Sequence, residues 1–311
     1  MTDASPRAPA TGRQLDRTGL AAAVWASLIW GVFPAYFKAL EGAGALEIVM
    51  HRALWALPTM AAVLLLMGRV RSALAQIARP RAMGALTLTA LIIGGNWLVY
   101  VIAVQRDHVL EASLGYYIGP LVSVGLGVAL LGERLTRLGW TAIALAGAGV
   151  VNQAIVVGQP PVYALTLAFS FALYGYLRKV AKVDAGAGLL AETLVLAPFA
   201  VAGVVWLEAS GTGHMFDGAR LGGLLVLAGP LTVLPLFLFA VGARRLPLVV
   251  LGLLQYIGPS IQFAIGIAFG EPFTPAHAIT FTLVWTGLAV FTWDAIATAR
   301  AEKRRGVLEP S

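Results

Sequence analysis

The chain alternates between long apolar stretches and short polar connections. Apolar runs of about 20 residues, the length that a helix needs to cross a bilayer, recur along the whole sequence. The connections between them are too short to form a water-soluble domain. We therefore predict an all-α polytopic membrane protein with ten transmembrane helices. The predicted spans are 18–40, 45–67, 82–104, 110–131, 137–157, 160–178, 187–207, 219–241, 247–269 and 276–298.

The composition agrees with a lipid environment. Of the 311 residues, 59% are hydrophobic and only 12% are charged, whereas a soluble domain usually has about 25% charged residues. The mean hydropathy is +0.83. Cysteine is absent, which excludes a disulfide framework and a thiolate metal site. We expect no cofactor and no bound metal, because the four histidines are scattered without paired metal-ligand spacing.

The positive charges are distributed unevenly along the chain. If the N-terminus lies inside and the spans alternate, 18 of the 22 Lys and Arg residues fall in cytoplasmic segments. Cytoplasmic loops retain Lys and Arg, so we predict that both termini are cytoplasmic. The net charge of +7 is then explained by membrane topology, and it does not indicate a nucleic-acid partner.

The two ends of the chain are polar. The apolar run behind residues 1–17 is full length and has no convincing cleavage site, so we interpret it as a retained first span rather than a signal peptide. We expect residues 1–17 to form a disordered cytoplasmic tail. Residues 299–311 are expected to form a basic cytoplasmic tail that is disordered from residue 301 onwards.

One interrupted apolar segment occurs twice. The string "YIGP" at 117–120 returns at 256–259, at an offset of 139, and the "GE" at 132–133 returns at 270–271, at an offset of 138. A weaker match pairs "SLIWG" at 27–31 with "FALYG" at 171–175. We therefore predict two five-helix repeats, residues 18–157 and 160–298. Because five is odd, the second repeat must enter the membrane in the opposite orientation.

Inverted repeats are typical of secondary transporters, in which a central site lies at the repeat interface. Proline in a span frees a backbone carbonyl and glycine lets helices approach closely, so the segments around Pro120 and Pro259 are the best pointers to that site. The alternative is that both are packing kinks. We expect spans four and nine to cross near the pseudo-two-fold axis, with Tyr117 and Tyr256 each closing the pathway at opposite membrane faces.

Polar and aromatic residues inside the predicted spans are candidates for function, because ionisable groups at membrane depth are costly. The candidate substrate-binding residues are Trp30, His51, Arg52, Asn96, Trp97, Tyr100, Tyr116, Tyr117, Tyr174, Gln255 and Tyr256. The candidate coupling residues, which would carry a proton, are Glu47, His51, Glu111 and Glu192.

Several of these residues also have a structural interpretation. Arg52 can snorkel to the interface or pair with Glu47, and Asn96 can hold two helices together. Glu111 and Glu192 can favour the positive end of their own helices. Outside the candidate set, Glu133 is expected to have a structural role beside Arg134 and Arg137, and Lys38 is expected to snorkel.

Longer strings carry a family resemblance. They are "WGVFPAYFK" (30–38), "EIVMHRALW" (47–55), "NWLVYVIAV" (96–104), "LEASLGYYIGPLVSVGLGVALLGERLTRLGW" (110–140), "LAFSFALYGYLRK" (167–179) and "LGLLQYIGPSIQFAIGIAFGE" (251–271). From about residue 18 to 300 the chain resembles the EamA-like branch of the drug/metabolite transporter superfamily, and in particular the RarD-type permeases. The resemblance implies a bacterial inner-membrane exporter of small metabolites, amino acids or drugs.

The competing functions are an integral-membrane enzyme, a passive facilitator and a membrane sensor. The sequence disfavours an enzyme, because it has no catalytic constellation at membrane depth, and an ATP-driven pump, because it has no nucleotide-binding motif. The facilitator and the sensor stay open. The expected partners are a small-molecule substrate, the lipid bilayer and protons as the candidate coupling ion, and the chain is expected to be a monomer or a weak dimer.

Overall fold

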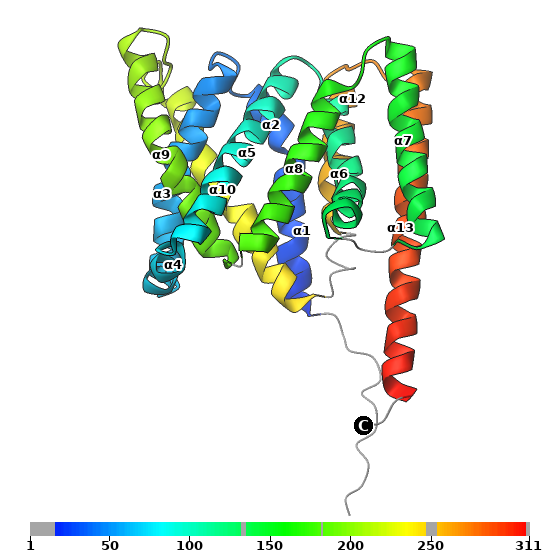
Figure 1. Ribbon diagram of the computed structural model, residues 1–311. Helices are drawn as coiled ribbons and strands as arrows, with labels where there is room; N and C mark the ends of the chain where they lie inside the picture. Colours follow the sequence, from blue (N-terminus) through cyan, green and yellow to red (C-terminus); the bar gives the residue numbers. More distant parts are fainter. Residues whose placement is uncertain (1–15, 132–134, 182, 247–253, 309–311) are drawn as a thin grey trace, which may run out of the picture.

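The structure is a computed structural model that describes residues 16–131, 135–181, 183–246 and 254–308. These residues form a bundle of α-helices, and no β-strand occurs among them (Figure 1). The helices are α1 (Arg17–Gly31), α2 (Phe33–Lys38), α3 (Ala45–Leu66), α4 (Val70–Ile77), α5 (Pro80–Gln105), α6 (Val109–Leu131), α7 (Arg137–Val157), α8 (Val162–Ala181), α9 (Ala185–Ala209), α10 (Ala219–Arg245), α12 (Ile257–Ala268) and α13 (Pro275–Leu308).

Eight helical segments in the described residues are long and apolar enough to cross a membrane. The prediction of an all-α polytopic membrane protein is therefore confirmed. The first segment runs from Arg17 to Lys38 and combines α1 and α2. Two predicted spans are not among the eight. α8 has 20 residues, but charged residues near its C-terminal end lower its hydropathy. α12 has only 12 residues, and residues 247–253, which precede it in the predicted span, lie outside the described residues. Ten spans remain a prediction.

In the polar segments, one helix was not predicted and one prediction was wrong. The connection between the second and third spans contains the helix α4, whose Ala73 and Ile77 are buried. The sequence analysis missed it because eight amphipathic residues are too few to stand out from a loop. At the C-terminus, α13 continues to Leu308, so the residues from 301 to 308 are helical instead of disordered.

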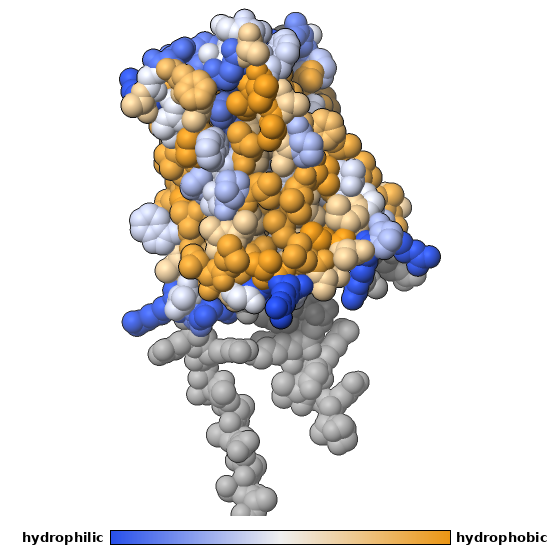
Figure 2. Space-filling model, turned by 90° about the vertical axis from the view of Figure 1, so that its left-hand side faces the viewer, coloured by the Kyte–Doolittle hydropathy of each residue, from blue (hydrophilic) through white to orange (hydrophobic). Residues whose placement is uncertain are grey.

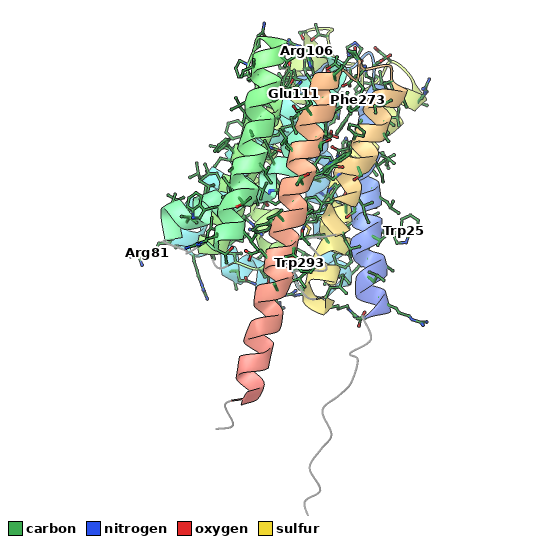
Figure 3. All side chains as sticks on the ribbon, turned by 90° about the vertical axis from the view of Figure 1, so that its right-hand side faces the viewer. Trp25, Arg81, Arg106, Glu111, Phe273 and Trp293 are labelled. Atoms are coloured by element: carbon green, nitrogen blue, oxygen red, sulfur yellow. The ribbon has the colours of Figure 1, made fainter. Side chains whose placement is uncertain are left out.

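The two ends of the bundle differ. The N-terminal end of α1 and the C-terminal end of α13 lie on the same side (Figure 1), which we call the terminal face. The opposite, distal face carries the loops 39–44, 106–108, 158–161, 210–218 and 269–274. A broad apolar band separates two polar ends (Figure 2). Trp25 and Trp293, which are 60% and 69% exposed, lie towards the terminal face, as expected of aromatic side chains at a membrane interface (Figure 3).

Polar side chains join helices that are distant in the sequence. Asp184 caps the N-terminus of α9 by accepting from the Ala187 amide at 2.9 Å, and it also accepts from Gln76 of α4 at 2.7 Å and from Arg69 at 2.9 Å. On the distal face, the Glu271 carboxylate accepts from the Val109 and Leu110 amides, which begin α6. These bonds satisfy amides that have no partner within their own helices.

Close helix contacts depend on small residues. A Cβ atom on Gly229 of α10 would lie 2.3 Å from the Trp55 carbonyl carbon of α3, and one on Gly287 of α13 would lie 2.8 Å from the Ala142 oxygen of α7. Lipid tails are as apolar as the side chains, so helices in a membrane associate mainly through such close packing. Glycine at these positions therefore sets how closely α3 approaches α10 and α7 approaches α13.

We expect Gly229→Ala to destabilise the protein, because the added methyl group meets backbone atoms that have no room to move. Overpacking of this kind typically costs about 1–3 kcal/mol. The control is Gly223→Ala on the same helix, where an added Cβ meets nothing within 4 Å. Both variants gain the same helix propensity, so thermal unfolding in detergent isolates the steric effect. Equal unfolding temperatures for the two variants would contradict the packing.

Candidate functional site

Arg52 lies in an aromatic cage in the interior of the bundle. Its guanidinium carbon is 4.3 Å from the Trp97 ring centroid, 5.4 Å from that of Phe33 and 5.8 Å from that of Phe37. Its Nε donates a hydrogen bond of 2.7 Å to the hydroxyl of Thr232 on α10. The Thr232 hydroxyl in turn donates to the Ala228 carbonyl. The cage therefore combines residues from α2, α3 and α5 with one from α10.

The positive charge of Arg52 has no acidic partner in the part of the chain that the structure describes. Arg52 is 6% exposed, and among the described residues no carboxylate lies within 4.0 Å of its guanidinium and no hydrogen bond leaves its Nη1 or Nη2. Both structural interpretations of Arg52 are wrong: it does not snorkel to the surface, and Glu47 pairs with His214 instead. A buried guanidinium with two free donor groups can bind an anion, which would offset the cost of burying its unpaired charge.

A chain of aromatic rings leads from the cage towards Glu192. Ring centroids are 5.8 Å apart for Phe37 and Tyr100, 5.5 Å for Tyr100 and Tyr116, 6.4 Å for Tyr116 and Phe171, and 5.9 Å for Phe171 and Tyr174. The hydroxyl of Tyr100 is buried and has no hydrogen-bond partner. The predicted site residues Tyr100, Tyr116 and Tyr174 thus lie along one chain of rings, and Trp97 contacts Arg52 at its start.

Glu192 forms a second buried polar cluster at the end of this chain. Its carboxylate accepts from the Thr89 hydroxyl at 2.8 Å and from the Tyr174 hydroxyl at 3.2 Å, and it lies 3.6 Å from Nε of Arg178. Glu192 is 1% exposed and lies beyond the first turn of α9, which begins at Ala185, so the alternative that it favours the positive end of its own helix is wrong. Gly188 makes room for the cluster, because a Cβ there would overlap the Arg178 guanidinium.

The remaining candidate substrate-binding residues have simpler contacts. Asn96 donates to the Ser170 hydroxyl at 2.9 Å and to the Leu167 carbonyl at 3.2 Å, which joins α5 to α8 as the structural interpretation expects. The ring centroids of Trp30 and Phe239 are 5.7 Å apart, and the backbone carbonyl of Trp30 accepts a hydrogen bond from the Gln262 side-chain amide. Gln255 is half-buried.

Tyr117 and Tyr256 lie against each other. Their ring centroids are 6.2 Å apart and nearly parallel, and the Tyr117 hydroxyl forms a 2.6 Å hydrogen bond with Ser260. Spans four and nine therefore do meet at the repeated motif. The expectation that the two rings close opposite membrane faces was wrong, because stacked rings lie at one depth. A groove of about 690 Å³ runs beside the pair along α12, lined by Tyr256, Ile257, Ser260, Ile261, Ala264, Ile265 and Ala268.

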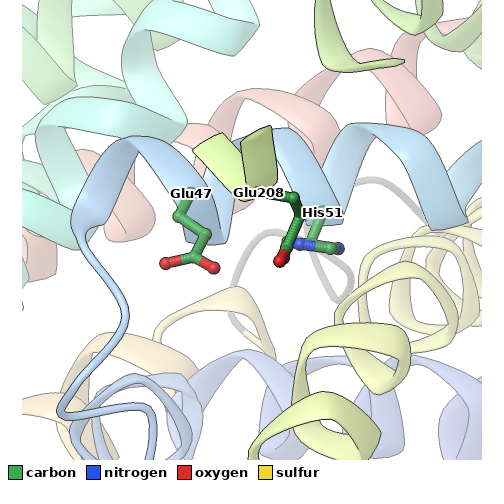
Figure 4. Close-up of side chains that lie close together, drawn as sticks. All are labelled: Glu47, His51 and Glu208. Atoms are coloured by element: carbon green, nitrogen blue, oxygen red, sulfur yellow. The ribbon is translucent and has the colours of Figure 1, made fainter. Parts of the chain in front are cut away.

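Towards the distal ends of α3 and α9, Glu47, His51 and Glu208 come together (Figure 4). Each of the three side chains offers one oxygen or nitrogen atom as a ligand, and these three atoms lie within 4.8 Å of one another. Glu47 also accepts from the His214 amide at 2.6 Å and bonds its imidazole at 2.8 Å, and this bond raises the pKa of His214. The sequence analysis singled out Glu47 and His51 but missed Glu208 and His214, which are more than 150 residues away.

The other predicted acidic and basic residues have structural contacts. Glu111 accepts from the amides of Tyr163 and Ala164, so it caps α8 and not its own helix. Lys38 pairs with Asp107 on the distal face. Desolvation raises the pKa of the Glu271 carboxyl, although the two amides that it caps oppose this shift. Glu133 lies outside the described residues.

Comparisons with known proteins agree on the class of protein. The model of the EamA-like transporter family matches residues 17–152. An uncharacterized transporter of Vibrio cholerae is 44% identical, with 94% of this chain and 97% of the relative covered. Protein RarD of Escherichia coli K12 is 42% identical, with 91% and 97% covered, and the uncharacterized transporter YojE of Bacillus subtilis is 42% identical, with 89% and 94% covered.

A solved crystal structure shares the fold. It superposes with a TM-score of 0.60 and 20% sequence identity, and the match covers 88% of this chain and 96% of that chain. At this level of identity the likeness supports the arrangement of the helices and nothing finer.

Proposed function

Because the chain belongs to the RarD-type branch of the EamA-like transporters in the drug/metabolite transporter superfamily, we propose that it is a secondary transporter that exports a small metabolite across the inner membrane by alternating access. The cargo is an amino acid or another small amphiphilic, drug-like solute with a carboxylate group. The comparisons and the apolar helices establish a multi-pass membrane protein of a transporter family. The cargo, the direction, the mechanism and the location in a bacterial inner membrane are the proposal.

Arg52 is the observation that carries the proposal. Its Nη1 and Nη2 have no partner among the described residues, and the nearby Tyr100 hydroxyl is also unpaired. A carboxylate accepts two parallel hydrogen bonds from a guanidinium and neutralises its charge. The faces of Trp97, Phe33 and Phe37 suit an apolar body beside that carboxylate. An ionisable group at this depth is a functional candidate by default.

The helix contacts support two inverted halves, residues 18–157 and 160–298. In this arrangement the counterparts are α1 and α8, α3 and α9, α5 and α10, α6 and α12, and α7 and α13. Each contact between two helices should then recur between their counterparts. The contacts α1–α10, α1–α12 and α3–α10 do recur, as α8–α5, α8–α6 and α9–α5. The pairs α3–α9, α6–α12 and α7–α13 map onto themselves. α1 runs towards the distal face and α8 runs away from it (Figure 1). This symmetry suits two halves that exchange conformations.

The charges support a cytoplasmic terminal face. Arg69, Arg79 and Arg81 lie on this face around the helix α4, and Arg81 projects outwards in Figure 3. Arg106 lies at the distal face in the same view. Because cytoplasmic loops retain Lys and Arg, this distribution supports a cytoplasmic position for both termini.

Labelling of single cysteines tests this orientation in the cysteine-free chain. Ser72 on α4 and Ser210 after α9 are both exposed, and cysteine closely matches serine in size. In intact cells, a membrane-impermeant thiol reagent should label Ser210→Cys and leave Ser72→Cys unlabelled until the membrane is permeabilised. The reverse pattern would contradict the orientation.

Binding of paired solutes tests the role of Arg52. Purified protein is screened by thermal shift with amphiphilic amino acids. Each amino acid is compared with the derivative in which its carboxyl group is converted to a primary amide. We expect stabilisation by carboxylates and little by the amides. Arg52→Gln should weaken binding of the best carboxylate about 30-fold or more, since loss of one partner of a buried charge pair costs about 2 kcal/mol or more. Arg52→Lys should retain part of the affinity.

The matched control is Arg81→Gln, which removes an exposed charge at the terminal face. It should leave solute affinity unchanged. Amides that bind as tightly as their acids, or an unchanged affinity in Arg52→Gln, would rule out the carboxylate proposal. Ligand that binds without crossing the membrane of proteoliposomes would favour a sensor.

Glu192 is the coupling group that the structure favours among the four candidates. Glu111 satisfies backbone amides, whereas Glu192 is buried beside Arg178 and reached by the aromatic chain from Arg52. A carboxylate that alternates between pairing with Arg178 and binding a proton would link a proton gradient to the two conformations of the bundle.

Transport in proteoliposomes tests this coupling. Glu192→Gln has nearly the same shape and keeps one acceptor oxygen, for either Thr89 or Tyr174, but it does not titrate. We therefore expect solute exchange to persist and accumulation driven by a pH gradient to be lost. Glu41→Gln, whose side chain is 77% exposed, is the control and should accumulate solute like the parent. Accumulation by Glu192→Gln would exclude this residue. Transport by the parent without any response to the gradient would indicate a passive facilitator.

A further inference from the structure

A polar cluster towards the distal face is not used by the transport proposal. Glu47 and His51 are 2% and 1% exposed on α3, and Glu208 is half-buried near the end of α9. Figure 4 shows the Glu208 carboxylate beside the imidazole of His51, with the Glu47 carboxylate one turn away along α3. The loop that follows α9 holds both carboxylates in place: the amides of His214 and Met215 donate to Glu47 and Glu208 at 2.6 and 3.1 Å.

The imidazole of His51 is incompletely paired. Its Nδ1 accepts a hydrogen bond from the Trp55 indole at 3.3 Å. Its Nε2 is buried and has no hydrogen-bond partner. Trp55 lies one turn towards the C-terminal end of α3, whereas Glu47 lies one turn towards the N-terminal end, so Nε2 is the nitrogen left to face the carboxylates. Leaving a buried imidazole nitrogen unpaired costs free energy, so the position between this nitrogen and the two carboxylates suits an ion or a water molecule.

We propose that Glu47, His51 and Glu208 bind a divalent transition-metal ion of the zinc class. Zn²⁺ takes neutral imidazole nitrogen and carboxylate oxygen at about 2.0–2.2 Å. To bind the ion through Nε2, the His51 imidazole must carry its proton on Nδ1, so the 3.3 Å hydrogen bond from the Trp55 indole is lost when the ion binds. Ligand atoms around such an ion lie about 3.3 Å apart, so atoms within 4.8 Å need only small side-chain movements to reach it. Three protein ligands leave a fourth position for water, which is the arrangement of an open zinc site.

The donor set also argues against other occupants. Mg²⁺ and Ca²⁺ prefer six or more oxygen ligands, whereas this cluster offers two carboxylates and an imidazole nitrogen. A direct ion pair does not explain the cluster, because no carboxylate oxygen of the described residues lies within 4.0 Å of a His51 nitrogen. A water molecule is the remaining rival for the position between the three side chains.

The site joins the two halves of the chain. Glu47 and His51 come from α3, and Glu208 comes from α9, its counterpart in the second half. A bound ion would hold the distal ends of these helices together. Binding itself needs neither a transported solute nor a gradient, so it is tested separately from the transport proposal.

Calorimetric titration of the purified chain with ZnCl₂ tests the proposal, with an affinity tag that contains no histidine. We expect saturable binding of one ion per chain and no comparable binding of MgCl₂. Glu208→Gln, the mildest change because this residue is only half-buried, should weaken Zn²⁺ binding at least about 10-fold, and His51→Gln should abolish it. Thermal unfolding without metal checks that each variant is folded, and Zn²⁺ should raise the unfolding temperature of the parent more than that of Glu208→Gln.

The matched controls are His108→Gln and His277→Gln, which remove the two histidines that lie outside the cluster. Both should bind Zn²⁺ like the parent. Absence of saturable binding in the parent would overturn the proposal and favour a water molecule at the site. Unchanged binding in a folded Glu208→Gln variant, or loss of binding in either control, would place the ion elsewhere and overturn it equally.

Discussion

Water does not satisfy polar groups in the hydrocarbon region of a membrane, so each buried polar side chain needs a partner within the protein. Most of the polar side chains in the bundle meet this requirement by joining distant helices. Asn96 donates to the Ser170 hydroxyl of α8, Glu271 caps the N-terminus of α6, and the Thr232 hydroxyl accepts a hydrogen bond from Arg52. The exceptions are informative. Among the described residues, the Nη atoms of Arg52, the Tyr100 hydroxyl and Nε2 of His51 have no hydrogen-bond partner, and both proposals of a ligand start from these groups in the aromatic cage and the distal cluster. Single buried atoms of Ser27, Arg178 and Gln262 are also unpaired.

The contacts of the helices give these two places different roles. The cage around Arg52 uses α2, α3 and α5 of the first half and Thr232 of α10 in the second, so a solute bound there would touch both halves. Small residues such as Gly229 let α3 and α10 pack closely near it. The distal cluster also joins the halves, through α3 and α9, but near the ends of the helices. A change at either place would alter how the halves fit together.

The sequence predicted most of the fold because span length follows from bilayer thickness, and most predicted spans agree with the helices to within a few residues. The helix α4 escaped detection because it is short and amphipathic. Arg52 was recognisable as a charge inside an apolar run, whereas Glu208 and His214 join Glu47 only through tertiary contacts. The repeated motif predicted that Tyr117 and Tyr256 occupy comparable positions near the axis, but their expected depths were wrong, because two rings that stack against each other lie at one depth.

The most direct test of the central claim is an experimental structure of the chain bound to the carboxylate that stabilises it most strongly in the thermal-shift screen. The account predicts that the solute carboxylate lies within hydrogen-bonding distance of Nη1 and Nη2 of Arg52, with its apolar body against Trp97. A structure in which the solute binds elsewhere, while Arg52 pairs with a carboxylate of the protein, would contradict it.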